Sequence, residues 1–117
     1  MWRAPWISIG YPSLGRIYID KVDEDEIDES GINPDFVEGD NWLHDRTQAV
    51  HRRYIPDHHI FIAKGLFKIG IYKVIKTLVH ELTEVLAMSK GISYDQAHSE
   101  VANPVETKIA QEMKNGR

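Results

Sequence analysis

The chain has 117 residues, of which 42% are hydrophobic and 27% are charged, a composition typical of one soluble domain with a modest core. It carries 18 acidic against 14 basic residues, and the formal net charge of −4 argues against nucleic acid as a partner, because nucleic-acid-binding faces are basic. The absence of cysteine excludes disulfides and thiolate metal sites, so any metal must be held by histidine and carboxylate groups.

The apolar segments predict neither a signal peptide nor a membrane span. Met1–Trp6 lacks the continuous apolar core of a signal peptide. The most apolar stretch, Leu66–Met88, is interrupted by more polar and charged side chains than a spanning helix tolerates: Lys68, Lys73, Lys76, His80, Glu81 and Glu84. We therefore expect an intracellular protein with no membrane partner.

The N-terminal part of the chain predicts strands and loops. Residues 1–15 contain two prolines and two glycines, which predict an irregular arm with one short strand at Trp6–Ile9, ahead of a single domain over residues 16–117. Arg16–Val22 alternates between apolar and polar residues, as a half-buried strand does. Asp20–Asp40 is strongly acidic and predicts a solvated loop or short helix, or alternatively an acidic clamp for a basic partner.

The middle of the chain contains the best-supported element. Residues 41–57 show no decisive pattern, and Ile60–Ala63 predicts a second strand. Gly70–Lys90 predicts a long helix that Gly91 terminates. Its apolar residues recur at helical spacing: Ile71, Val74, Ile75, Leu78, Leu82, Val85 and Leu86.

Two further helices are predicted after this long one. Ser93 opens the first, with Gln96 three residues later completing a capping box. Asn103 and Pro104 end or kink that helix, and they also suit the cap and first position of a last helix. Strands first and helices last predict an α+β domain.

The long helix carries a metal-binding pattern in the segment His80-Glu81-Leu82-Thr83-Glu84. His80 and Glu84 are four residues apart, so their side chains share one helix face and both reach a single ion, most plausibly zinc. Glu81 is rotated by roughly 100° and borders the site, where a general base for water belongs. Apolar neighbours place His80 and Glu84 beside buried surface, where a carboxylate without a cation would be costly.

A third metal ligand is needed, and two residues qualify. His98 lies on the helix after the turn at Gly91–Ser93, which folds back against the long helix. Glu106 is the competitor, although it also falls three residues after Asn103 and suits a capping box. Three protein ligands with an open position predict a catalytic site, whereas four predict a closed structural one.

The remaining histidines carry weaker signals. His58 and His59 are adjacent on a predicted strand, so they point to opposite faces and at most one faces the metal-binding helix. A surface or strand-end position is the expectation for both. His44 and His51 have no supporting pattern.

The helical half of the chain resembles a known family. The run from Leu78 to Glu84, followed by Met88, Gly91, Tyr94, Ala97-His98, Ala102 and Glu106, is similar to small phage- and virus-associated proteins with the pattern His-Glu-x-x-Glu … Tyr-x-x-Ala-His-x-x-Ala-x-x-x-Glu. These proteins resemble minimal zinc-peptidase (zincin) domains. The resemblance covers roughly the last forty residues well, and it implies a zincin-like fold and, for a viral chain, a host-cytoplasmic location.

The resemblance also implies roles for individual residues. His80, Glu84 and His98 would be zinc ligands, Glu81 the catalytic base, and Glu106 an added ligand or a carboxylate that orients a histidine. The function expected is a zinc-dependent, peptidase-like hydrolase, with the strand at His59–Ala63 holding an extended peptide or protein substrate. The alternative is a non-catalytic, metal-stabilised viral structural or interaction protein.

Overall fold

The computed structural model describes residues 3–28, 36, 38–47 and 54–115. Parts of the acidic segment (29–35 and 37) and of the unassigned segment (48–53) lie outside the described residues. The strands are β1 (Arg3–Tyr11), β2 (Gly15–Val22), β3 (Gly39–Asn41) and β4 (His59–Ala63). The helices are α1 (Glu24–Asp28), α2 (Trp42–Thr47), α3 (Lys64–Ile69), α4 (Ile71–Ser89), α5 (Tyr94–Gln96), the π-helical η1 (Ala97–Ala102) and α6 (Asn103–Asn115).

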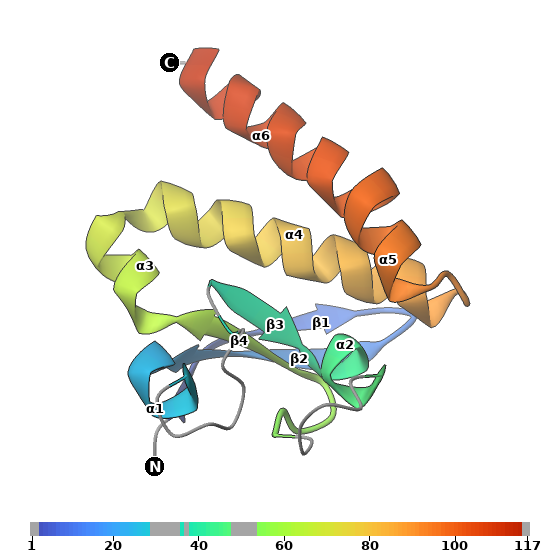
Figure 1. The fold of residues 1–117 in the computed structure, drawn as a ribbon, viewed down its shortest axis with the longest axis horizontal. Coiled ribbons are helices and arrows are strands. Elements are labelled where there is room, and N and C mark those ends of the chain that lie inside the picture. Colours follow the sequence, from blue (N-terminus) through green and yellow to red (C-terminus); the bar gives the residue numbers. More distant parts are fainter. Residues whose placement is uncertain (1–2, 29–35, 37, 48–53, 116–117) are drawn as a thin grey trace.

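The four strands form one mixed sheet in the order β1-β2-β4-β3. β1 pairs antiparallel with β2, β2 pairs parallel with β4, and β4 pairs antiparallel with β3. Helix α4 lies across one face of the sheet, and α6 starts at the C-terminal end of α4 and runs back above it at an angle (Figure 1). The predicted α+β class is therefore confirmed: the two long helices, α4 and α6, follow the four strands, and the short helices α1 and α2 lie between strands.

The core lies mainly between the sheet and α4. Alternate residues of a strand share one face, so the isoleucines of β2 and β4 bury together. The buried cluster on this side includes Ile17, Ile19, Ile60, Ile62, Val74, Leu78 and Val85. Among the described residues, no helix combines the length and the apolar character needed to cross a bilayer.

The prediction of an irregular arm over residues 1–15 is wrong, because Arg3–Tyr11 forms β1 and belongs to the sheet. The strand predicted at Trp6–Ile9 lies within it. Pro5 is tolerated because β1 is an edge strand and its pairing with β2 is irregular between Pro5 and Ile7. Proline and glycine were local signals against a strand, and pairing with β2 overrides them.

The acidic segment is less solvated than its composition predicts. It contains the short helix α1, as one of the two expectations had it. Its two ends, however, are buried: Asp20 lies in β2 and Asp40 in β3, and both side chains face protein partners. A buried carboxylate needs such partners, so Asp20 and Asp40 are part of the protein interior and not of a solvated loop.

Helix α4 ends as the sequence predicts. Gly91 has a φ of 95°, a left-handed conformation that favours glycine. Its N–H donates to the carbonyl of Met88 at 3.0 Å, and the N–H of Ile92 donates to the carbonyl of Ala87 at 3.3 Å. This pair of hydrogen bonds is the Schellman motif, which satisfies carbonyls left free at the helix end.

The C-terminal helices differ from the prediction. Ser93 caps the helix start as expected, accepting from the N–H of Gln96 at 3.3 Å. α6 begins at Asn103 as predicted, but the chain stays helical at this point, because Asn103 has helical angles (φ −62°, ψ −45°) and does not cap the helix from outside. Its N–H donates to the carbonyl of His98, five residues earlier, so a wider π-helical turn precedes the proline.

We predict that Gly91→Ala lowers the free energy of unfolding by about 1–2 kcal/mol, because a Cβ is strained at positive φ. Urea denaturation followed by circular dichroism measures this change. Lys90→Ala is the matched control, since Lys90 has an ordinary φ of −94°. Equal midpoints for the two variants would contradict the role of Gly91.

Candidate metal centre

Two side chains of α4 lie one turn apart at the margin of the core. The side chain of His80 is 9% exposed and that of Glu84 is 2% exposed. The i, i+4 spacing brings Nε2 of His80 to 2.8 Å from Oε2 of Glu84. The apolar face of α4 holds the helix on the sheet, so this pair is fixed on a rigid element.

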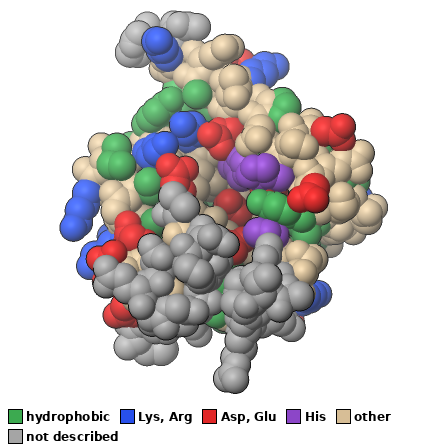
Figure 2. Space-filling model, viewed as in Figure 1, with side chains coloured by type: hydrophobic (Ala, Val, Ile, Leu, Met, Phe, Trp, Pro, Cys, Tyr) green, Lys and Arg blue, Asp and Glu red, His purple; other side chains and the backbone are tan. Residues whose placement is uncertain are grey.

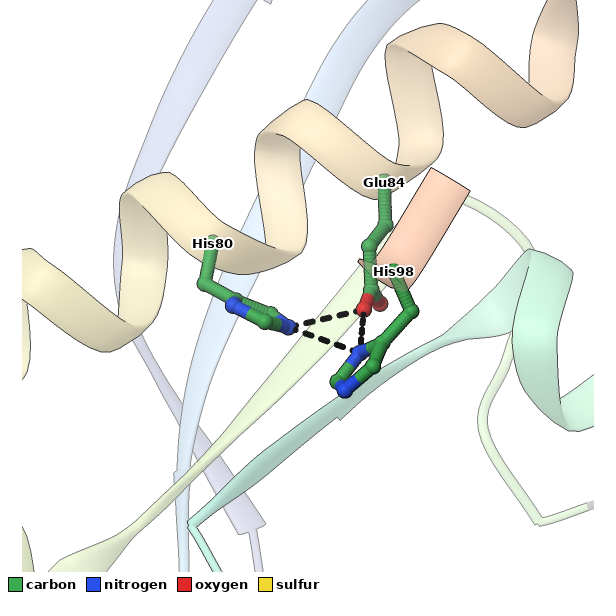
Figure 3. A group of neighbouring side chains, drawn as sticks. All are labelled: His80, Glu84 and His98. Carbon is green, nitrogen blue, oxygen red and sulfur yellow. Dashed lines mark hydrogen bonds and ion pairs between the residues drawn. The ribbon is translucent and has the colours of Figure 1, made fainter. Parts of the chain in front are cut away.

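A third donor comes from the π-helical turn η1. Nδ1 of His98 lies 2.5 Å from Oε2 of Glu84 and 3.1 Å from Nε2 of His80 (Figure 3). The three donor atoms form a group that could hold one metal ion. Of the two residues considered for the third position, His98 is therefore the one that converges with His80 and Glu84.

Glu106 lies on the other side of His80. Its Oε1 is 2.7 Å from Nδ1 of His80, without the alignment of a hydrogen bond, and its Oε2 is 3.7 Å from Nζ of Lys76. The two ring nitrogens of His80 thus face different carboxylates. Glu106 occupies the place of a carboxylate that orients a histidine, rather than converging with the other three donors.

The electrostatic setting of Glu84 fits a cation. Among the described residues no lysine or arginine pairs with this buried carboxylate, and its charged partners are His80 and His98. Burial acts to raise the pKa of Glu84, but hydrogen bonds from the two histidines outweigh it and hold the pKa below the ordinary value. Two imidazole nitrogens and one carboxylate oxygen are the donor set of several catalytic zinc sites.

The pKa of His80 is shifted in the direction opposite to that of Glu84. Burial acts to lower its pKa, but the hydrogen bond to Glu84 and the charges of Glu84 and Glu106 raise the pKa above the ordinary value. A proton and a metal ion therefore compete for the same nitrogen.

Glu81 lies beside this group and points toward the sheet. It is buried, and its Oε1 accepts a hydrogen bond from Nδ2 of Asn41 at 2.8 Å. Burial first, and then the negative charges of Glu84 and Asp40, raise the pKa of Glu81 well above its ordinary value. Glu81 is therefore a carboxyl group that holds a proton more readily than an exposed glutamate.

Sequence reasoning missed Asn41, which lies in the segment that showed no decisive pattern. Asn41 is fully buried at the end of β3, and its Nδ2 also donates to Oε1 of Glu84 at 3.1 Å. The only local signal was an asparagine followed by a short helical segment, which is typical of a helix cap. Its proximity to α4 follows from the strand order and is not visible in the local sequence.

Two more residues outside the predicted set border the site. The ring of Tyr94 stacks on that of His44, with centroids 3.5 Å apart, and its hydroxyl lies 3.3 Å from Nδ1 of His98. Nδ1 of His44 lies 2.7 Å from Oδ1 of Asp40. Burial, followed by the charges of nearby carboxylates, raises the pKa of Tyr94. The stack joins α2 to the helix that carries His98.

The adjacent histidines His58 and His59 lie away from the candidate metal centre. His58 is exposed and stacks on Trp42, and Nδ1 of His59 lies 2.6 Å from Oδ2 of Asp20. Both match the expected strand-end positions. The expectation that the strand at His59–Ala63 receives a substrate is wrong, because β4 pairs with β2 on one side and β3 on the other.

The candidate centre opens on one face of the molecule. In Figure 2, histidine side chains reach the surface and acidic side chains are visible deeper between them. The side chain of His98 is 40% exposed, in contrast to its two buried partners. Solvent therefore approaches the group from the side of the C-terminal helix.

Comparisons with protein-family models, with curated proteins and with solved structures find no match to this chain.

We predict that Glu106→Gln weakens zinc binding by roughly 10–100-fold, as is typical when a residue that orients a metal ligand is lost. His80→Ala and His98→Ala each remove a ligand and should weaken zinc binding by more than this. Competition with a chromogenic zinc chelator measures the affinities. His58→Asn is the matched control, because His58 is exposed and asparagine tolerates its positive φ. Equal losses for His58→Asn and His98→Ala would contradict the assignment.

Proposed function

We propose that this chain is a zinc-binding protein of the minimal zincin type that acts as a metal-dependent hydrolase on peptides. The observation that carries the proposal is the convergence of His80, Glu84 and His98, with donor atoms 2.5–3.1 Å apart. The exposed side of His98 supports an open coordination position rather than a closed structural site. The motif resemblance points to the same class.

His80, Glu84 and His98 would hold the zinc ion, which would supply Lewis acidity that polarises a water molecule and the peptide carbonyl. Glu81 would accept the proton that this water loses when its oxygen attacks the peptide carbonyl. The same proton would pass to the leaving amine as the C–N bond breaks. Burial, followed by the charges of Glu84 and Asp40, raises the pKa of Glu81, which makes its carboxylate a stronger proton acceptor than that of an exposed glutamate.

The edge strand β3 supports an extended peptide as the substrate. β3 is at the edge of the sheet, and Asn41 at its end contacts both Glu81 and Glu84. A peptide that added to this edge by backbone hydrogen bonds would run past the three donors. β3 thus replaces β4 in the role that the sequence had suggested.

We predict that Glu81→Gln keeps stoichiometric zinc but loses peptide hydrolysis by roughly 100-fold or more, because the amide cannot accept the proton. Mass spectrometry of a mixture of unstructured peptides incubated with the zinc-loaded protein measures turnover. Glu112→Gln is the matched control, since Glu112 is exposed on α6. Unchanged turnover in Glu81→Gln would rule out this mechanism.

A second candidate function is a metal-stabilised, non-catalytic structural or interaction protein of a virus. It is favoured by the burial of Glu81, whose Oε1 is already hydrogen-bonded to Asn41. In this case the metal contributes to folding, as in small metal-dependent domains.

If the protein is metal-stabilised and non-catalytic, chelation should lower its stability strongly, and no hydrolysis should be detected with zinc bound. Removing zinc that was present at about 1,000 times its Kd would lower the free energy of unfolding by about 4 kcal/mol. Differential scanning calorimetry with and without a chelator measures this change. Stabilisation by zinc is expected of both functions, so hydrolysis separates them: peptide turnover that needs zinc and is lost in Glu81→Gln would contradict the second function and favour the first.

A further inference from the structure

Asn41 joins the sheet, α2 and α4 through one side chain. It immediately precedes α2, and its Oδ1 accepts from the backbone N–H of His44 at 2.9 Å. This is the hydrogen bond of an N-cap residue to the third helical residue. Because Oδ1 is committed to α2, the amide orientation is determined, and Nδ2 faces α4.

The two N–H groups of this amide meet two carboxylates. Nδ2 lies 2.8 Å from Oε1 of Glu81 and 3.1 Å from Oε1 of Glu84. The other oxygen of Glu84, Oε2, is the one that faces His80 and His98. Asn41 therefore holds Oε1 of the Glu84 carboxylate, while Oε2 faces the two histidines.

The backbone is built to bring Asn41 this close. A Cβ at Gly39 would lie 3.0 Å from Cγ2 of Thr77 and 3.1 Å from the carbonyl of Phe61, so only glycine lets β3 approach α4 without displacement. The N–H of Asn41 itself donates to Oδ1 of Asp40 at 2.9 Å. Gly39 and Asp40 thus fix the backbone position from which the side chain of Asn41 reaches α4.

We propose that Asn41 is a positioning residue of the metal centre, fixing the carboxylate of Glu84 so that Oε2 is presented to the ion and anchoring Glu81 beside it. This inference rests on the proposed metal binding. Capping α2 does not by itself require asparagine, because serine and aspartate cap helices as well. Asparagine alone among them offers an amide that caps with its oxygen and donates to both carboxylates with its nitrogen.

The test is Asn41→Ser, which retains a capping hydroxyl and removes the amide donor. We expect zinc affinity to fall by about 10–100-fold. The visible absorption spectrum of the cobalt(II)-substituted protein should also change, since the Glu84 carboxylate is free to rotate. Asp23→Ala is the matched control, because Asp23 accepts from the N–H of Asp25 at the start of α1. Its zinc affinity and cobalt spectrum should equal those of the unmodified chain.

A second variant covers the case in which Asn41→Ser does not fold. Asn41→Thr keeps a capping hydroxyl on a side chain suited to a strand end and has no amide donor, so its cobalt spectrum should differ from that of the unmodified chain. An unchanged spectrum, or Asn41→Ser with zinc affinity within twofold of the unmodified chain, would overturn the inference and leave Asn41 as a helix cap. Failure of the unmodified chain to bind zinc or cobalt would instead overturn the proposed function, and this inference with it.

Discussion

The carboxylate of Glu84 is almost completely buried, and its two oxygens face different parts of the fold. Oε2 meets the imidazoles of His80 and His98, and Oε1 meets the amide of Asn41. A buried carboxylate is costly without compensating partners, so α4, η1 and β3 must all be in place to satisfy it. This requirement links the packing of the protein to the geometry of the candidate centre.

The charge balance around Glu84 explains why a cation fits here. Glu81 and Asp40 are further acidic groups on the side of the sheet, and burial, followed by the negative charges of Glu84 and Asp40, raises the pKa of Glu81. The nearby lysine, Lys76, lies beyond His80 and contacts Glu106 instead. A divalent ion among the three converging donors would offset this negative charge and, by binding only the folded chain, would stabilise the fold.

Local sequence patterns predict the elements well and the contacts between distant elements poorly. Helical spacing placed the long helix and, with it, the pair His80 and Glu84. Asn41 was missed because its partners lie 40 and 43 residues away and meet it only through the strand order. Pro5 misled for a related reason, since an edge strand accommodates a proline that local rules treat as a break, whereas Pro104 correctly indicated the first turn of α6.

The most direct test of the account is X-ray absorption spectroscopy at the zinc edge of protein loaded with one equivalent of zinc. The account predicts two imidazole nitrogens and carboxylate oxygen at about 2.0–2.2 Å, with one further light-atom ligand from solvent. The imidazole signal should fall by half in a His98→Ala sample. Zinc that stayed fully hydrated, or an imidazole signal unchanged by that substitution, would contradict the claim that His80, Glu84 and His98 hold one ion.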